Sequence, residues 1–314
     1  MAVGRVAEVT HRGVGRQTGR QAHQPEGSFV SAPTVRRRQL GRTLRALRES
    51  LGLKQEDVSA RSSGALNGAK ISRIETAKTA ASAKDVAVIL DALDVRDGEL
   101  RSSLLKLTRE GSRRGWWQSY RSVLSAAYED LISLESEATQ ISTWQPSVIP
   151  GLLQTGEYAR QIIAATAMSA AAEDRVDALV EVRLARQSVL TREDPLTLWA
   201  IIGEAALRTQ CPEERIMHDQ LSRLLRLAER PTITIQVLPS TSAPHVGQMG
   251  AYSILGYGAH ADLAVVHVES LTSALYVEDR GDVAVYQDAV ERLRAAALST
   301  GQSVDMIREI RDSK

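Results

Sequence analysis

The sequence predicts an α+β protein: an all-α domain of five short helices, residues 36–110, precedes an α+β domain, residues 116–312, with a mostly antiparallel sheet. Three observations predict this division. Apolar residues recur at helical spacing in the first region. Aromatic residues are absent between Val30 and Gly115 and then arrive together. Five strand-like runs follow in the second half of the 314-residue chain, which is long enough for about two domains.

The first two helices are predicted from apolar spacing. One begins at Arg36 and ends near Gly52, because four leucines recur at intervals of four, three and four residues: Leu40, Leu44, Leu47 and Leu51. A second, short helix is expected over residues 55–61. The Ser- and Gly-rich run SSGALNG then predicts a loop.

Capping residues predict the next three helices. Asn67 is a favourable N-cap for a helix from about Gly68 to Thr76. Ser82 and Asp85 have the spacing of a capping box, which predicts a fourth helix. Asp97 is expected to cap a fifth, so this part of the chain is predicted to be a small aliphatic bundle.

The aromatic cluster marks the second domain, and we place the boundary at residues 111–115. Helices are expected at about 117–140, 155–167, 173–191 and 213–228, with a last one at about 282–298. The strand-like runs are LTLWAII, TITIQVLP, GAYSILGY, LAVVHVES and SALYVED.

Charge is distributed unevenly although the net charge is only +1. Residues 1–116 hold 22 Lys and Arg against 12 Asp and Glu, whereas residues 117–314 hold 17 against 26. A basic region attracts polyanions and an acidic one is repelled by them, so any nucleic acid should bind the first third. Residues 1–35 lack apolar periodicity and are expected to form a disordered basic tail.

The predicted third helix has two different faces. Ile71 and Ile74 should point inward, whereas Ala69, Ser72 and Arg73 should point outward with Lys70 at the edge. Small residues beside cations would let this helix approach a DNA groove closely. A solvated surface is the alternative for this helix by itself, but a short helix, a turn and a second helix in a basic bundle favour DNA binding.

Several segments resemble a known family. The runs LRALRESLGLKQEDVSARS, KISRIETAKT and SAKDVAVILDALDV resemble the XRE-type helix-turn-helix regulators. That resemblance implies double-stranded DNA as a partner, a backbone contact by Gln55, and an internal pair between Glu75 and Arg48. Farther on, GWWQSYRSVL, LESEA, IPGLLQTGEYAR, VEVRLARQSVL, GEAAL and TITIQVLP resemble the C-terminal domain of unknown function of actinobacterial antitoxin-like XRE regulators.

The chain departs from the family pattern at several places, including Ser59 and Ser62, which stand at usually apolar positions of the second helix. The loop after the second helix is about two residues longer than the usual turn. Gly68 and Ala69 stand where longer base-reading side chains are common, and Ala77 replaces the usual glycine after the third helix. The fold is therefore a firmer expectation than sequence-specific readout.

The predicted DNA-binding residues lie mainly on the second and third helices. The cations Lys70, Arg73 and Lys78, helped by residues 36–38, are expected to hold phosphates, while small side chains approach base edges. One such helix reads few base pairs, so a homodimer is expected. The full set is Gln55, Asn67, Ala69, Lys70, Ser72, Arg73 and Lys78.

Aromatic and charged residues of the second domain could line a ligand pocket. Aromatic walls with a few polar groups suit small molecules, but core packing of the rings and a buried ion pair of the charged groups remain open alternatives. The candidates are Trp116, Trp117, Trp144, Tyr158, Arg186 and Glu204.

Catalytic and metal-binding patterns are scarce in the sequence. GxSxG, HExxH and P-loop motifs are absent, and Cys211 is the only cysteine. His245, His260 and His267 lie without regular spacing on or beside strand-like runs, which favours loop or sheet surface over a metal site. We expect no cofactor and no metal, and the lack of a catalytic motif favours a non-enzyme while the question of catalytic activity stays open. We also expect a cytoplasmic protein without a membrane partner, since no signal peptide or long apolar run occurs.

The function that these features predict is a DNA-binding transcriptional regulator with a C-terminal domain for a small-molecule effector or a partner. Two alternatives stay open. The C-terminal domain could work as an enzyme or small-molecule-binding module beside a weakened helix-turn-helix. The family resemblance also implies an antitoxin-like role with a small partner protein encoded nearby.

Overall fold

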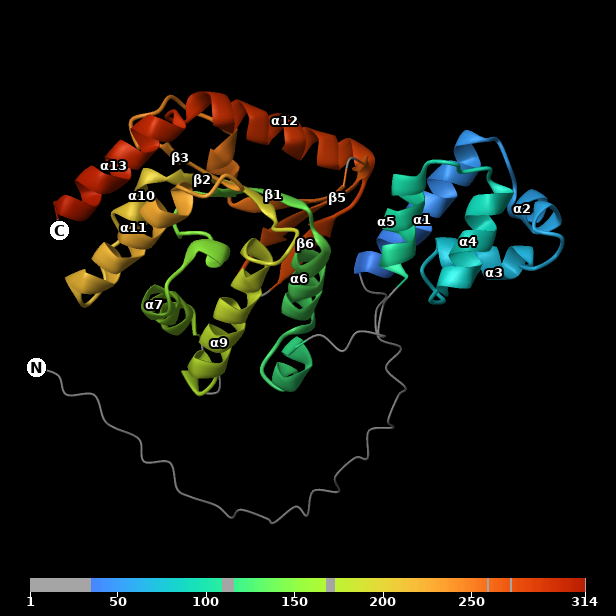
Figure 1. The fold of residues 1–314 in the computed structure, drawn as a ribbon, viewed down its shortest axis with the longest axis horizontal. Helices are drawn as coiled ribbons and strands as arrows, with labels where there is room; N and C mark the ends of the chain where they lie inside the picture. Colours follow the sequence, from blue (N-terminus) through green and yellow to red (C-terminus); the bar gives the residue numbers. More distant parts are fainter. Residues whose placement is uncertain (1–34, 109–115, 168–172, 259, 272, 314) are drawn as a thin grey trace, which may run out of the picture. The chain divides into compact units, whose positions relative to one another are not determined.

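The N-terminal part of the described structure is a bundle of five short helices, as predicted (Figure 1). The structure is a computed structural model and describes residues 35–108, 116–167, 173–258, 260–271 and 273–313. The helices are α1 (Val35–Ser50), α2 (Gln55–Arg61), α3 (Gly68–Glu75), α4 (Ala83–Ala92) and α5 (Gly98–Leu107). The predicted tail and domain boundary lie outside the described residues, apart from Val35.

Side-chain caps fix where these helices begin. The side chain of Asn67 accepts a hydrogen bond from the backbone N–H of Lys70. Ser82 and Asp85 form a complete capping box at the start of α4, and Asp97 accepts from two backbone N–H groups of α5. Each cap satisfies N–H groups that have no partner inside the helix, which explains why helix starts could be predicted from these residues.

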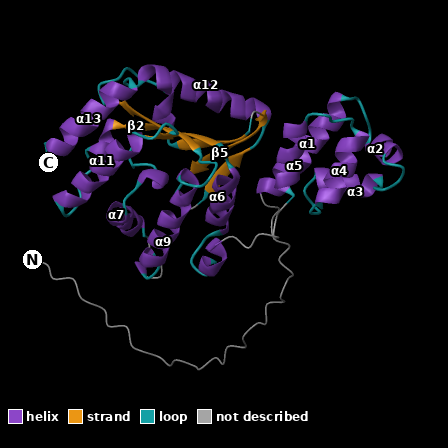
Figure 2. Cartoon of the chain, viewed as in Figure 1, coloured by secondary structure: helices purple, strands orange, loops and turns teal. Residues whose placement is uncertain are grey.

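The second domain combines helices with a six-stranded sheet (Figure 2). Its strands are β1 (Gln140–Gln145), β2 (Thr197–Gly203), β3 (Ile233–Leu238), β4 (Tyr252–Tyr257), β5 (His260–Glu269) and β6 (Ala274–Val277). Its α-helices are α6 (Ala126–Glu137), α7 (Gly156–Thr166), α9 (Val176–Arg186), α10 (Glu204–Leu207), α11 (Glu214–Ala228), α12 (Arg280–Ala296) and α13 (Thr300–Asp312). Short 3-10 helices are η1 (Trp116–Tyr120), η2 (Gly151–Leu153), η3 (Gln187–Leu190) and η4 (Val246–Met249).

The sheet is mixed, which corrects the expectation of a mostly antiparallel sheet. Its strand order is β3-β2-β1-β4-β5-β6. The pairs β1–β2 and β2–β3 are parallel, whereas β1–β4, β4–β5 and β5–β6 are antiparallel. Part of the error arose at β1, a strand that was not predicted and that lies between β2 and β4. The other parallel pair, β2–β3, joins two strands that were predicted.

Two helix predictions in this domain were also wrong. The single helix expected over residues 117–140 is instead η1, a turn and α6, followed directly by the start of β1. The helix at the end of the chain is α13, which begins after a capping box of Ser299 and Gln302 and was not predicted. Helices expected near 155–167, 173–191, 213–228 and 282–298 correspond to α7, α9 with η3, α11 and α12.

Helices cover both faces of the sheet. Figure 1 shows α12 on one face and α6, α7, α9 and α11 on the other. Under α12, Val283, Val290 and Leu293 pack with Trp144 and Tyr252 in one apolar cluster. Among the residues that the structure describes, no helix is long and apolar enough to cross a membrane.

Candidate nucleic-acid interface

The third helix is anchored by its apolar face. Ile71 and Ile74 are fully buried, as predicted, while Ala69 and Arg73 are exposed and Ser72 is half-buried. The side chain of Arg73 makes no hydrogen bond or ion pair with the residues that the structure describes. A guanidinium placed in this way on a helix of small outward residues can reach a phosphate or a guanine edge.

Glycines allow the helices around α3 to approach one another. A Cβ at Gly41 of α1 would lie 2.5 Å from the carbonyl oxygen of Ile74 and 2.6 Å from that of Glu75. A Cβ at Gly68 would lie 3.3 Å from Oε1 of Glu56 in α2. Gly68, a departure from the family pattern, therefore lies at the start of α3, where α3 packs closely on α2.

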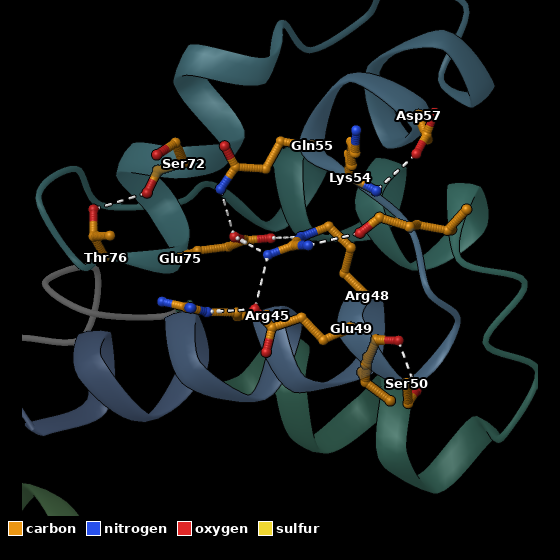
Figure 3. Close-up of polar contacts among 12 residues, drawn as sticks. Arg45, Arg48, Glu49, Ser50, Lys54, Gln55, Asp57, Ser72, Glu75 and Thr76 are labelled. Atoms are coloured by element: carbon orange, nitrogen blue, oxygen red, sulfur yellow. Dashed lines mark hydrogen bonds and ion pairs between the residues drawn. The ribbon is translucent and has the colours of Figure 1, made fainter.

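A buried ion pair holds the end of α3 on α1 (Figure 3). The Nε of Arg48 donates to Oε1 of Glu75 at 2.7 Å, and its second terminal nitrogen donates to Oε2 at 3.0 Å. Arg48 also donates to the carbonyl oxygen of Leu53 at 2.7 Å. The hydrogen bond that Arg48 donates to Glu75 raises the pKa of Arg48. The pair that the family resemblance implied is present.

Gln55 belongs to the same network. Its Nε2 donates to Oε2 of Glu75 at 2.8 Å, and Figure 3 shows this amide turned toward the carboxylate. Gln55 is the first residue of α2, so Glu75 fixes the orientation of the amide proposed to contact the DNA backbone. The second N–H of that amide remains the donor suited to a phosphate oxygen.

Lys70 is engaged within the domain. Its Nζ donates to Oδ1 of Asp85 at 2.7 Å, across to the first turn of α4. Burial of Asp85 raises its pKa, but hydrogen bonds from Lys70 and Ser82 outweigh this, so the pKa is lowered overall. Lys70 therefore has a structural partner, whereas Lys78 and the N-cap Asn67 are exposed.

The connections around α3 have unusual backbone angles. Residues 62–67 join α2 to α3, and within them Ser63 and Gly64 have φ of 52° and 76°. After α3, Ala77 has φ of 58° and is buried. This is the left-handed conformation that favours glycine, so the alanine adopts the geometry of the residue that it replaces.

Two of the three arginines at residues 36–38 are engaged away from the DNA-binding helices. Arg36 is buried and donates to Glu137 at 3.0 Å and to the carbonyl oxygen of Ser133. The Nε of Arg38 donates to Oε1 of Glu278 at 3.1 Å. These contacts join α1 to the second domain, and sequence reasoning missed them because the partners lie about a hundred or more positions away.

The six candidate pocket residues have separate environments. Trp116 and Trp117 contact each other edge to face, whereas Trp144 is buried under α12 and donates its indole N–H to the carbonyl of Gly247. Tyr158 is fully buried in the other core cluster. The structure therefore does not bring these four rings together.

The two charged candidates are paired in different places. Arg186 is buried and forms a two-point ion pair with Glu135, at 2.8 Å and 2.7 Å. Glu204 accepts from Arg208 at 2.6 Å and from the backbone N–H of Ser240 at 2.9 Å. Arg186 thus follows the ion-pair interpretation, with a partner that the sequence did not reveal.

One of the three histidines, His267, is more buried than expected. His267 is buried in β5 beside Tyr276, with ring centroids 5.1 Å apart. Burial, with a smaller effect of Arg186, lowers the pKa of His267 to about 4. Within the described ranges, no group of three or more His, Cys, Asp or Glu side chains could hold a metal ion.

Comparison with known proteins gave two matches. Residues 39–104 match the family described as a helix-turn-helix domain. Residues 128–309 match the family described as a domain of unknown function, DUF5753. No curated protein and no solved structure matched the chain.

Proposed function

Because this chain belongs to the DUF5753 family and carries a helix-turn-helix domain ahead of that region, we propose that it is a transcriptional regulator of the XRE type. The helix-turn-helix domain implies DNA binding. In the proposed complex α3 lies in the major groove and the first turn of α2 contacts the backbone. The observation that supports this most is the exposed face of α3, with Ala69 and Arg73 outward and Ile71 and Ile74 buried.

The proposed contacts differ in kind. Arg73 and Lys78 supply charge to phosphates, and Gln55 and Asn67 supply polar groups beside them. Ala69 and Ser72 let the helix approach base edges. Lys70 adds charge at the border of this surface while it is paired with Asp85, so we propose a smaller contribution from it than from Arg73.

The test is a DNA titration of charge-removing variants. Replacing Arg73 or Lys78 by alanine should weaken binding and reduce the slope of log affinity against log salt by about one each, because each removes one phosphate contact. Lys106→Ala removes an equally exposed lysine from α5 and is the matched control. Unchanged affinity and slope in the Arg73 variant would refute the assigned interface.

A homodimer is part of the proposal, since one recognition helix contacts too few base pairs for high specificity. Light scattering of the full chain, free and on DNA, should give the mass of two chains on one operator. A single chain in both states would contradict this part of the proposal.

We propose that the C-terminal domain acts on the DNA-binding domain as a sensor or partner-binding module. The supporting observation is that α1, whose Gly41 contacts the end of α3, also pairs through Arg36 and Arg38 with Glu137 and Glu278. Deleting residues 116–314 should change the affinity for DNA, or should change how that affinity responds when cell extract is added as a source of ligand or partner. A deletion that leaves both unchanged would contradict a regulatory role.

A further inference from the structure

A cavity of about 370 Å³ lies where α1 and α5 face the segment between β6 and α12. The described residues all belong to one compact unit, and this cavity lies within it. Its wall combines apolar groups, such as Ala46, Leu47 and Leu100, with the polar side chains of Gln39, Arg42 and Glu278. Apolar walls with a few polar groups and a volume in this range are typical of small-molecule sites.

Two buried acceptors in the wall lack donors. Gln39 is 3 % exposed, and its Nε2 donates to the carbonyl oxygen of Leu263 while its Oε1 has no hydrogen-bond partner among the described residues. Oε1 of Glu278 accepts from Arg38, but its Oε2 accepts no hydrogen bond. The guanidinium of Arg42 forms an ion pair with that oxygen at 3.7 Å, a distance too long for a hydrogen bond. Unsatisfied buried acceptors are costly, so a donor-bearing occupant is favoured.

Two backbone N–H groups in the first turn of the helix that begins at the cavity already have an acceptor. Asp279 lines the cavity and caps α12, and its Oδ1 accepts from the backbone N–H groups of Gly281 and Asp282. Anion binding at helix N-termini depends on such N–H groups being available. Arg42 and Arg280 also line the cavity, so the preference for a ligand that donates hydrogen bonds rests on the two acceptor oxygens of Gln39 and Glu278.

We propose that this cavity binds a small molecule whose nitrogen-bearing head group, an amine or amidine, donates to Gln39 and Glu278 while a short apolar body packs on Ala46, Leu47 and Leu100. Because α1 and α5 form part of the wall, the ligand bridges the helix-turn-helix domain and the C-terminal domain. The regulatory meaning of the site rests on the proposed function. The existence of the ligand site does not rest on the proposed function, since ligand binding is measured without DNA.

The test uses the full chain and benzamidine as the probe, with benzoate as a counter-probe of similar size and opposite charge. Calorimetric titration or saturation-transfer NMR should detect benzamidine and give much weaker binding of benzoate. Glu278→Gln should weaken benzamidine by about tenfold, because a charged acceptor is lost. Ala46→Leu should strongly weaken binding, because it adds three carbon atoms where the apolar body of the ligand packs while leaving Glu278 and its arginines in place.

The matched control is Glu137→Gln, which removes a carboxylate paired with Arg36 but outside the cavity wall. Retained binding in this control together with loss in Ala46→Leu supports the site. Absence of benzamidine binding to the parent chain, equal binding of benzoate, or full binding by the Ala46→Leu variant would each overturn the proposal. The DNA titration above can succeed or fail independently of these results.

Discussion

Arg48 in α1 and Glu75 at the end of α3 form a two-point ion pair in which both charged groups are buried. The same carboxylate receives the amide of Gln55 at the start of α2. One buried charge therefore connects the three helices that make up the proposed DNA-binding unit. The position of α3 depends on this pair as well as on the isoleucines beneath it.

Removing one partner of this pair should destabilise the helix-turn-helix domain strongly. In Glu75→Ala, Arg48 is left buried without its counter-charge, and we expect the free energy of unfolding to fall by about 3 kcal/mol. Urea unfolding followed by circular dichroism measures this. The free energy of unfolding should fall less in the double variant Arg48→Met, Glu75→Leu than in Glu75→Ala. A loss below about 1 kcal/mol in Glu75→Ala would contradict the structural role.

The close crossing of α1 and α3 gives a second stability prediction. Gly41→Ala places a Cβ against two backbone carbonyls that cannot rotate away, so the free energy of unfolding should fall by about 2 kcal/mol. Gly98→Ala is the control, because nothing lies within 4 Å of its added Cβ. That change should be neutral or stabilising by up to about 1 kcal/mol. Equal effects of the two changes would argue against the crossing.

The contact between Lys70 and Asp85 predicts a coupled pair. Lys70→Ala and Asp85→Asn should each lower stability, and the double variant should lose less than the sum of the two. Because the lysine is partly exposed, we expect a coupling energy of at most about 1 kcal/mol. A double-mutant cycle by thermal unfolding measures it. Strict additivity would show that the two side chains do not interact in solution.

His267 predicts a pH dependence of stability. Its pKa is about 4 when folded, below the unfolded value of about 6.5, so the unfolded chain takes up the proton first. The contribution of this histidine to the free energy of unfolding is complete above pH 6.5. It falls by up to about 3 kcal/mol as the pH drops toward 4.

Unfolding of the parent chain and of His267→Gln should be compared between pH 7 and pH 4.5. The variant should lose less stability over this range. His218→Gln, which replaces a half-exposed histidine of α11, should behave like the parent. If His267→Gln has the same pH dependence as the parent, His267 is not buried in its neutral form.

The helix-turn-helix domain was predictable because its signals are local. Asn67, Ser82 and Asp97 each cap the helix that follows, and the observed helices begin where these residues predict. In the second domain, β1 reads QISTWQ and alternates apolar and polar residues, but only Gln140 lies within the helix predicted over residues 117–140, and no strand was predicted for the rest. Without β1, the parallel pair β1–β2 could not be predicted. The parallel pair β2–β3 joins two predicted strands with α11 between them, an order typical of parallel pairing that the prediction did not use.

The side-chain partners of the candidate DNA-binding residues were less predictable than the side of the helix on which these residues lie. Ile71 and Ile74 could be assigned inward from helical periodicity alone, as the structure confirms. The partners of Lys70 and Arg38 could not, because Asp85 and Glu278 lie 15 and 240 positions away. Periodicity gives the side of a helix on which a residue lies, whereas pairing depends on how separate elements pack.

The central claim, that this chain is a DNA-binding regulator, is tested most directly by titrating the full chain against its own promoter region and a random duplex at two salt concentrations. The account predicts a preference for the promoter that persists at the higher salt, because base contacts are less salt-dependent than phosphate contacts. Equal binding of both duplexes that disappears at the higher salt would contradict it. In that case the bundle would be a basic surface without sequence readout.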